Sequence, residues 1–121
     1  MSHNKLTAHF TSNEMACHCC GGLQTKQELM SKLENARCEV GIPFIIISGY
    51  RCSHNNKRAG GKANSSHLRG MAADIGVKTS QDRFIILKAL FSAGFTRIGV
   101  ARTFIHVDVD PCKTHNLIWT Y

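Results

Sequence analysis

Hydrophobic side chains recur at helical spacing in the first third of the chain. They follow one another at steps of three and four residues: Leu29, Leu33, Ala36 and Val40. Lysines and glutamates occupy the positions between them, so the segment has one apolar and one polar face. This pattern predicts a helix that begins near Thr25 and ends at Gly41, with Pro43 close behind. An earlier helix start is indicated at residues 10–14, where a hydroxyl side chain precedes Glu14.

A second helical period is present in the later half of the chain. Ser80 is a suitable N-cap, Gly94 a suitable end, and the predicted helix spans residues 81–92. The side chains on its period are Phe84, Leu87, Lys88 and Phe91. We expect the stripe from Phe84 to Phe91 to pack into the core, together with Leu29 and Leu33 of the first helix.

Five short apolar or alternating segments predict strands. They are residues 44–47, expected to be a buried strand, then 71–77, 97–100, 103–109 and the edge strand 117–121. Residues 52–66 are polar and rich in Asn, Lys and Gly, which predicts a long functional loop. The order of these elements predicts an α+β fold with a small antiparallel sheet flanked by helices.

Length and composition fit one compact domain. The chain has 121 residues, of which 43% are hydrophobic, and its apolar segments are spread over the whole length. We therefore expect residues 1–121 to form a single domain with a core of its own. No apolar run approaches membrane-spanning length, so we expect no membrane insertion. Residues 1–10 contain no apolar stretch typical of a signal peptide, so we expect synthesis in a cytoplasm.

The formal charge is +7, which favours anionic partners such as nucleic acid, acidic lipid or the bacterial cell wall. No block of five like charges occurs, so the basic tail of many nucleic-acid-binding proteins is absent. The alternative of a nucleic-acid-binding zinc protein draws on this charge and on the cysteines. We expect no nucleic-acid partner.

Six cysteines are present, and three of them lie in the segment Cys17-His18-Cys19-Cys20. Adjacent cysteines rarely form a disulfide with each other, so this segment indicates either soft metal ligands or reduced thiols. A second metal site would need a further ligand from Cys38, Cys52 or Cys112. Buried thiols, or a disulfide that involves Cys52 or Cys112, are the alternative that we favour.

Asp74 interrupts an apolar segment, between Ala73 and Ile75. A buried carboxylate without partners costs several kcal/mol, so a cation or hydrogen-bond donors must accompany it. In the predicted strand 103–109, alternation places His106 and Asp108 on one face, with Asp110 following in the same phase. That face is either exposed to solvent or builds a polar site. Catalytic zinc takes three protein ligands, and His67, Asp74 and His106 form a candidate set whose spacing alone does not establish that they meet.

Three motifs in order carry a resemblance to a known family. The pattern Ser-x-His-x-x-Gly-x-Ala-x-Asp is matched by Ser65, His67, Gly70, Ala72 and Asp74. Ser48-Gly49-Tyr50-Arg51 precedes it, and the strand segment Phe104-Ile105-His106-Val107-Asp108 follows it. From about residue 10 to its end, the chain resembles the zinc D-alanyl-D-alanine carboxypeptidases of peptidase family M15. These include VanX-type dipeptidases and phage endolysins, and the Hedgehog amino-terminal domain shares their fold.

The resemblance implies a role for each matching residue. His67, Asp74 and His106 would bind one Zn²⁺ ion. Arg51 would stabilise the developing oxyanion or the substrate carboxylate. Ser65 would hydrogen-bond the substrate backbone, and Tyr50 would lie at the substrate.

One position departs from the family pattern. Many members carry an acidic general base three residues before the last zinc histidine, where this chain has Thr103. Asp108 shares a strand face with His106 and is the substitute base that we name. Two alternatives remain: Asp108 orients a ligand without moving a proton, or the base is absent or comes from elsewhere, such as His54 or His115.

The resemblance implies a zinc metallopeptidase that hydrolyses peptidoglycan stem peptides, as a D,D-carboxypeptidase or an endopeptidase. We expect a monomer of the phage or prophage lysin type, which would reach the cell wall after release from the cytoplasm. The alternative is a non-catalytic zinc-binding module of the same fold, which Thr103 at the usual base position favours.

Overall fold

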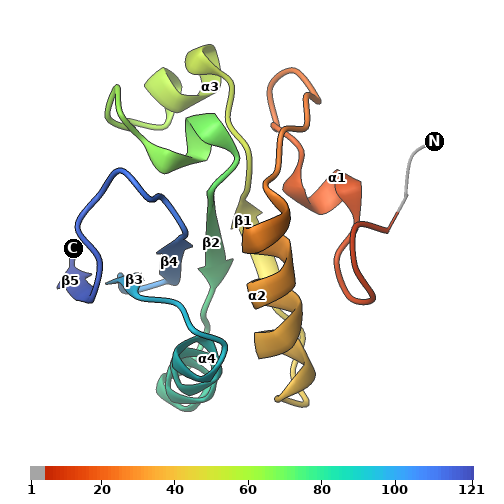
Figure 1. Cartoon of the computed structure of the whole chain (residues 1–121), viewed down its shortest axis with the longest axis vertical. Coiled ribbons are helices and arrows are strands. Elements are labelled where there is room, and N and C mark those ends of the chain that lie inside the picture. Colours follow the sequence, from red (N-terminus) through yellow and green to blue (C-terminus); the bar gives the residue numbers. More distant parts are fainter. Residues whose placement is uncertain (1–4) are drawn as a thin grey trace.

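A computed structural model describes residues 5–121 as a sheet with helices at its face and edges (Figure 1). The helices are α1 (Ser12–Met15), α2 (Gln27–Cys38), α3 (Ser53–Arg58), the 3-10 helix η1 (Ser66–Arg69) and α4 (Ser80–Ser92). The strands are β1 (Ile45–Ser48), β2 (Ala72–Gly76), β3 (Arg97–Val100), β4 (Phe104–Asp108) and β5 (Leu117–Thr120). The predicted α+β class is confirmed.

The five strands lie in the order β1-β2-β4-β3-β5. Neighbours pair antiparallel except at one edge, where β5 runs parallel to β3. The sheet is therefore mixed rather than wholly antiparallel. The parallel pair follows from the long connection after β4, residues 109–116, which carries the chain back past β3 before β5 begins.

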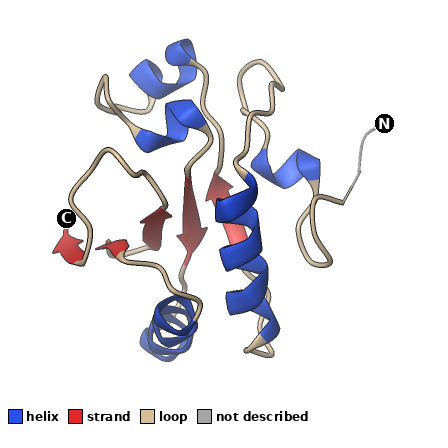
Figure 2. Cartoon of the chain, viewed as in Figure 1, coloured by secondary structure: helices blue, strands red, loops and turns tan. Residues whose placement is uncertain are grey.

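One face of the sheet is the core face, and α2 and α4 pack on it (Figure 2). Alternation supplies this face: Ala73 and Ile75 from β2, Ile105 and Val107 from β4, and Ile98 from β3 are fully buried. From α2, Leu29 and Leu33 join the same cluster, as expected. Burial of these side chains is the main force that holds helices and sheet together.

The opposite face carries the polar and aromatic positions of the same strands. Because side chains alternate, Asp74 on β2 and His106 on β4 point away from the core. Above this face lie α3 and η1, and the backbone N–H of Arg51 donates to the carbonyl of His67 at 3.1 Å. This hydrogen bond joins the Ser-Gly-Tyr-Arg segment that follows β1 to the Ser-x-His segment of η1 (Figure 1).

Three local expectations were wrong. β1 is an edge strand, so Ile45 and Ile47 are 51% and 43% exposed rather than buried. In α4, Phe84 and Phe91 are 68% and 48% exposed, and the buried stripe is Ile86, Ala89 and Leu90. This helix is apolar on more than one side. The spacing of its hydrophobic residues was therefore not enough to predict which side packs against the sheet. Residues 52–66 are not one long loop, because they contain α3.

Gly70 ends η1 in the left-handed conformation, with φ of 70°. A Cβ atom at this position would lie 1.4 Å from the carbonyl oxygen of Gln24, so only glycine fits. This close approach packs the Ser-x-His turn against the start of α2, and the N–H of Lys26 donates to the carbonyl of Gly70. Among the described residues, every helix is too short or too polar to cross a lipid bilayer.

Candidate metal centre

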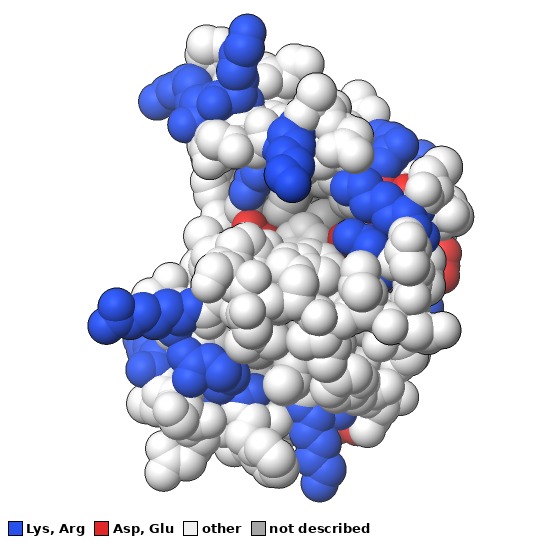
Figure 3. Space-filling view, turned by 90° about the vertical axis from the view of Figure 1, so that its left-hand side faces the viewer, with Lys and Arg blue, Asp and Glu red and all other residues white. Residues whose placement is uncertain are grey.

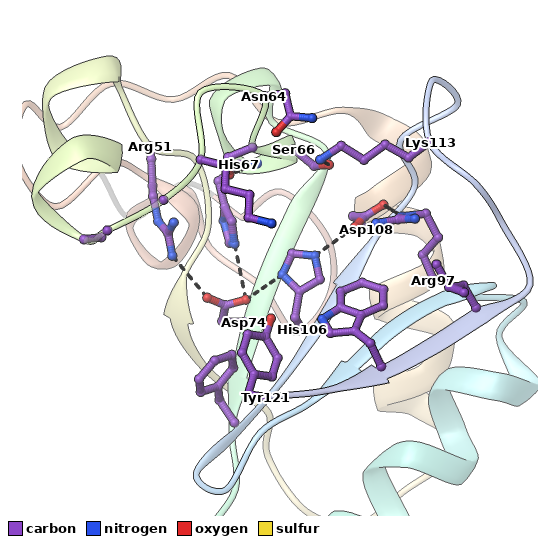
Figure 4. A pocket seen from close by; sticks show the side chains of 18 residues that line it. Arg51, Asn64, Ser66, His67, Asp74, Arg97, His106, Asp108, Lys113 and Tyr121 are labelled. Carbon is purple, nitrogen blue, oxygen red and sulfur yellow. Dashed lines mark hydrogen bonds and ion pairs between the residues drawn. The ribbon is translucent and has the colours of Figure 1, made fainter.

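Three side chains from separate elements converge on the polar face of the sheet (Figure 4). Asp74 and His106 are direct partners across the antiparallel β2–β4 pair, and His67 projects from η1 above them. Asp74 Oδ1 lies 2.9 Å from His106 Nδ1 and 3.2 Å from His67 Nε2. These three atoms lie within 4.8 Å of one another, which is the arrangement of a group able to hold a metal ion.

Each imidazole has an inner nitrogen that faces Asp74 and an outer nitrogen that faces away from it. The hydrogen bond of the outer nitrogen determines whether the inner nitrogen carries a proton or a lone pair. His67 Nδ1 lies 2.7 Å from the carbonyl of Gly49, and His106 Nε2 lies 2.8 Å from Asp108 Oδ2. Both partners are acceptors, so both outer nitrogens donate. In the neutral imidazoles the inner nitrogens then carry lone pairs that face the Asp74 carboxylate. The two nitrogen lone pairs and the Asp74 carboxylate converge on one point, where a metal cation can accept electron pairs from all three. Without a metal, protonation of an imidazole nitrogen would relieve the repulsion between these groups.

Electrostatics of the cluster favour ionised Asp74. Burial by itself would raise the pKa of Asp74, but the hydrogen bonds and charges of the two imidazoles, which act when these nitrogens carry protons instead of a metal, outweigh burial and hold the pKa well below its usual value. Burial lowers the pKa of His106, whereas hydrogen bonds to Asp108 and Asp74 raise it, and the raising contacts prevail. The centre therefore keeps a carboxylate charge although Asp74 is only 7% exposed.

Arg51 lies at the rim of the cluster and points to the other oxygen of Asp74. Its Nη2 is 3.2 Å from Asp74 Oδ2, and its Nε donates to Ser48 Oγ at 2.9 Å. Nη1 donates to Asn56, a residue of α3 that is 4% exposed and whose amide in turn donates to the carbonyl of Lys62. The guanidinium is thus held from three sides beside the candidate ligands.

Asp108 lies behind His106 and away from the convergence point. Its Oδ2 accepts from His106, and its Oδ1 accepts from Arg97 Nε at 2.8 Å and from the N–H of Asp110 at 3.2 Å. Its side chain is 1% exposed. Burial would raise the pKa of Asp108, but the contact with His106 and the charge of Arg97 lower it. Both oxygens are therefore occupied by structural partners.

A pocket of about 670 Å³ opens over these residues. His67, Asp74 and His106 form part of its wall with Arg51 and Ser65, and Ser65 also caps η1 by accepting from the N–H of His67. Further basic side chains in the lining are Lys62, Arg97 and Lys113. Figure 3 shows the molecule hollowed on this side, with Lys and Arg side chains around the hollow and small areas of Asp and Glu within it.

Two aromatic residues of the pocket come from the C-terminal end of the chain, Trp119 within β5 and Tyr121 directly after it. The Trp119 ring lies 5.5 Å from the ring of His106 and 5.0 Å from the guanidinium carbon of Arg97. Tyr121 also lines the pocket. The sequence indicated that these two side chains lie together, because residues two apart in an extended segment point to the same side. Lys113 and Arg97 had no such signal, because their place depends on the fold.

Several residues considered from the sequence lie outside the pocket. Tyr50 does not line it, and its ring instead approaches Gly22 beside the cysteines. Thr103 is exposed in the turn before β4 and does not line the pocket either. His54 is exposed on α3, and both ring nitrogens of His115 contact other partners, Thr96 and the carbonyl of Asp110. The pocket thus brings together Arg51, Ser65, Asp108 and the three candidate ligands.

Comparison with known proteins identifies a relationship for most of the chain. The family model described as Peptidase M15 matches residues 8–110, a segment that contains all three candidate ligands. No curated protein matches the chain.

Proposed function

This chain belongs to the peptidase M15 family, and on that premise we propose that it is a zinc-dependent metallopeptidase that hydrolyses peptidoglycan stem peptides. Membership supports a metallopeptidase. The observation that carries the finer proposal is the convergence of His67, Asp74 and His106 within 4.8 Å on the wall of an open pocket. We take the described residues as its peptidase domain.

The donor set fits zinc. Two imidazole nitrogens and one carboxylate oxygen are ligands that zinc accepts, and a set of three protein ligands leaves a position for water or substrate. Each histidine also has the outer hydrogen bond that is usual for metal-binding imidazoles, to Gly49 for His67 and to Asp108 for His106. The chemistry expected from a bound zinc ion is polarisation of the scissile carbonyl and activation of a water molecule at neutral pH.

Arg51 is the residue that we assign to the charge that develops on the substrate. Its guanidinium is fixed by Ser48 and Asn56 and lies 3.2 Å from Asp74 Oδ2, at the edge of the ligand cluster. A preorganised cation at this place would stabilise an oxyanion, or bind a substrate carboxylate, without rearrangement during the reaction. The Ser65 hydroxyl oxygen accepts from the backbone N–H of His67, and its proton can donate to a substrate carbonyl.

The remaining lining suits an acidic peptide. Lys62 and Lys113 add positive charge to the pocket, and the stem peptides of peptidoglycan carry free carboxylates. Trp119 and Tyr121 offer flat apolar surfaces on which short side chains such as alanine can lie. These features support a wall peptide as substrate, cleaved by carboxypeptidase or endopeptidase action. We propose that the enzyme acts at the cell wall, as a lysin does.

Asp108 is better suited to position His106 than to move a proton. Both of its oxygens have partners, and its side chain is 1% exposed, so a water molecule in the pocket has little access to it. We therefore assign Asp108 the role of orienting the imidazole and raising its basicity as a ligand. The assignment of Asp108 as general base stays a prediction, with Thr103 outside the pocket.

The proposal is tested with purified protein, zinc and digested peptidoglycan. Chromatography with mass analysis should reveal new stem-peptide products, and the mass lost or gained identifies the bond that is cut. His67→Ala should abolish these products and remove one equivalent of zinc. The matched control is His54→Ala, an exposed histidine outside the pocket, which should retain both.

Two results would decide against this function. A zinc-loaded protein that cleaves no peptidoglycan peptide would favour the non-catalytic zinc-binding module, which Thr103 at the usual base position suggests. If His67→Ala cleaved the peptides at the wild-type rate, the metal centre would have no role in the mechanism.

A further inference from the structure

A second cluster of metal-binding side chains lies outside the pocket, between two distant segments of the chain. Cys17, Cys20 and Cys52 bring their sulfur atoms within 4.8 Å of one another. The first two belong to the loop that joins α1 to α2, and Cys52 is the N-cap of α3. In Figure 1 this loop rises beside the segment that leads from β1 to α3. The fold thus joins thiols that are 35 positions apart.

The loop is shaped around the sulfur atoms by backbone hydrogen bonds. The N–H of Cys52 donates to Cys17 Sγ at 3.4 Å, and the N–H of Gly22 donates to Cys20 Sγ at 3.3 Å. The N–H of Asn55 donates to Cys52 Sγ at 3.4 Å. Each sulfur of the cluster therefore accepts at least one backbone N–H. Such contacts stabilise negative charge on sulfur, which a metal-bound thiolate carries.

The spacing of the first two cysteines is that of a metal-binding turn. Two residues separate Cys17 from Cys20, and both lie in a tight turn that is closed by the N–H of Gly21, which donates to the carbonyl of Cys17 at 2.9 Å. Structural zinc sites commonly take two ligands from such a Cys-x-x-Cys turn and the others from a distant segment. Here Cys52 is the ligand from the distant segment.

The three sulfur atoms lie between the interior and the surface. Cys17 is buried, Cys52 is half-buried and Cys20 is exposed, so an ion bound here would lie between the loop and the start of α3. Cys19 belongs to the same loop and is exposed, and it is the remaining thiol of this segment.

We propose that Cys17, Cys20 and Cys52 bind a structural Zn²⁺ ion, and that the exposed thiol of Cys19 in the same loop turns inward as the fourth ligand when the ion binds. Soft thiolates select zinc over calcium or magnesium, and four sulfur ligands match its tetrahedral preference. Binding replaces thiol protons by the metal, and the released protons go to solvent. No oxidation step is involved. This site is separate from the pocket, since none of these cysteines lines it.

The position of the cluster indicates how a bound ion would stabilise the fold. Tyr50 and Arg51 immediately precede Cys52, and the N–H of Tyr50 donates to the carbonyl of Met15, next to the cysteine loop. A metal at Cys52 would therefore fasten the segment that carries Arg51 to the N-terminal part of the chain. Loss of this ion should loosen Arg51 without removing any ligand of the metal centre in the pocket.

The test uses the full chain, purified under reducing conditions and reconstituted with Zn²⁺ or Co²⁺. Elemental analysis of the wild type should give two zinc ions per chain, and Cys20→Ser and His67→Ala should each give one. With cobalt, the wild type and His67→Ala should have strong near-ultraviolet absorption from sulfur-to-cobalt charge transfer, and Cys20→Ser should lose it. Cys112→Ser, which alters an exposed cysteine elsewhere, should behave as the wild type.

The outcomes separate this site from the metal centre of the pocket. One zinc ion that is lost in His67→Ala, with no sulfur-to-cobalt band in the wild type, would overturn the cysteine site and leave the peptidase proposal intact. Iron in place of zinc, or a disulfide that resists the reductant, would also overturn it. A sulfur-to-cobalt band that persists when His67→Ala is inactive would support the cysteine site.

Discussion

Asp108 Oδ2 lies 2.8 Å from His106 Nε2, while the other nitrogen of the same ring lies 2.9 Å from Asp74 Oδ1. The imidazole is thus clamped between two carboxylates, one inside the candidate metal centre and one behind it. Strand geometry produces this arrangement, because residues two apart on β4 share a face and Asp74 is the cross-strand partner of His106. The arrangement gives Asp108 a role that can be measured apart from catalysis.

Asp108→Asn should weaken metal binding more than it changes the chemistry of the loaded enzyme. Removal of a carboxylate behind a metal-binding histidine typically costs about 10- to 100-fold in metal affinity. Competition with a chelator measures the zinc Kd, and kcat is then measured at saturating zinc. Glu28→Gln, an exposed carboxylate on α2, is the control. An unchanged Kd with a large loss of kcat would instead identify Asp108 as the general base.

Arg51→Ala should lower kcat/KM for peptide cleavage by about 100- to 1000-fold, which is the usual effect of removing a donor to a developing oxyanion. The zinc content should stay the same, since Arg51 contacts Asp74 Oδ2 and not the oxygen that faces the histidines. Steady-state kinetics and elemental analysis measure the two quantities. Arg58→Ala changes an exposed arginine of α3 and should have no effect. Equal activity of the two variants would refute the role of Arg51.

Gly99→Ala should displace Trp119. A Cβ atom at Gly99 would lie 2.5 Å from the indole Nε1, so the ring must move away from His106. We expect a destabilisation of about 1–3 kcal/mol, as for other overpacked positions. Trp119 is the single tryptophan of the chain, so its fluorescence reports the displacement directly, alongside urea denaturation. In Gly41→Ala the new methyl meets open space, and this control should keep both the spectrum and the stability.

Stability should fall in acid through Asp110, whose side chain is fully buried. Burial raises its pKa, but hydrogen bonds from Ser66 and the N–H of Cys112 and the charge of Arg69 lower it below the ordinary value. A carboxyl with a depressed folded-state pKa stabilises the fold above its unfolded pKa of about 3.9. That stability is lost as the pH falls through the folded-state pKa.

Asp110→Asn tests this dependence. The variant should be less stable than the wild type at neutral pH, and the difference should shrink as the pH falls below about 4. Urea denaturation over a pH series measures the free energy of unfolding. Glu39→Gln, an exposed carboxylate, is the control and should change neither value. A difference between wild type and Asp110→Asn that stays constant with pH would contradict the assignment.

Much of the local structure was predictable because it depends on neighbouring residues alone. The positions of α1, α2, β2, β3 and β4 follow from caps, glycines and hydrophobic period, and each lies where the sequence indicated. The start of α1 has the expected form, with Thr11 and Glu14 in a capping box. The face of α4 was not predictable, because Phe84 and Ile86 both lie on apolar stripes and only contact with α2 and the sheet selects between them.

The amino-acid sequence was enough to indicate which side chains could form the candidate centre. Alternation along two strands puts Asp74 and His106 on polar faces, and the Ser-x-His motif adds His67. The folded chain was needed to see that β2 pairs with β4 in the register that sets Asp74 opposite His106, and that Asp108 has Arg97 as its partner. It also brought Cys52 to Cys17 and Cys20. Periodicity is a local property, whereas strand pairing and loop contacts depend on burial and backbone hydrogen bonding between segments far apart in the chain.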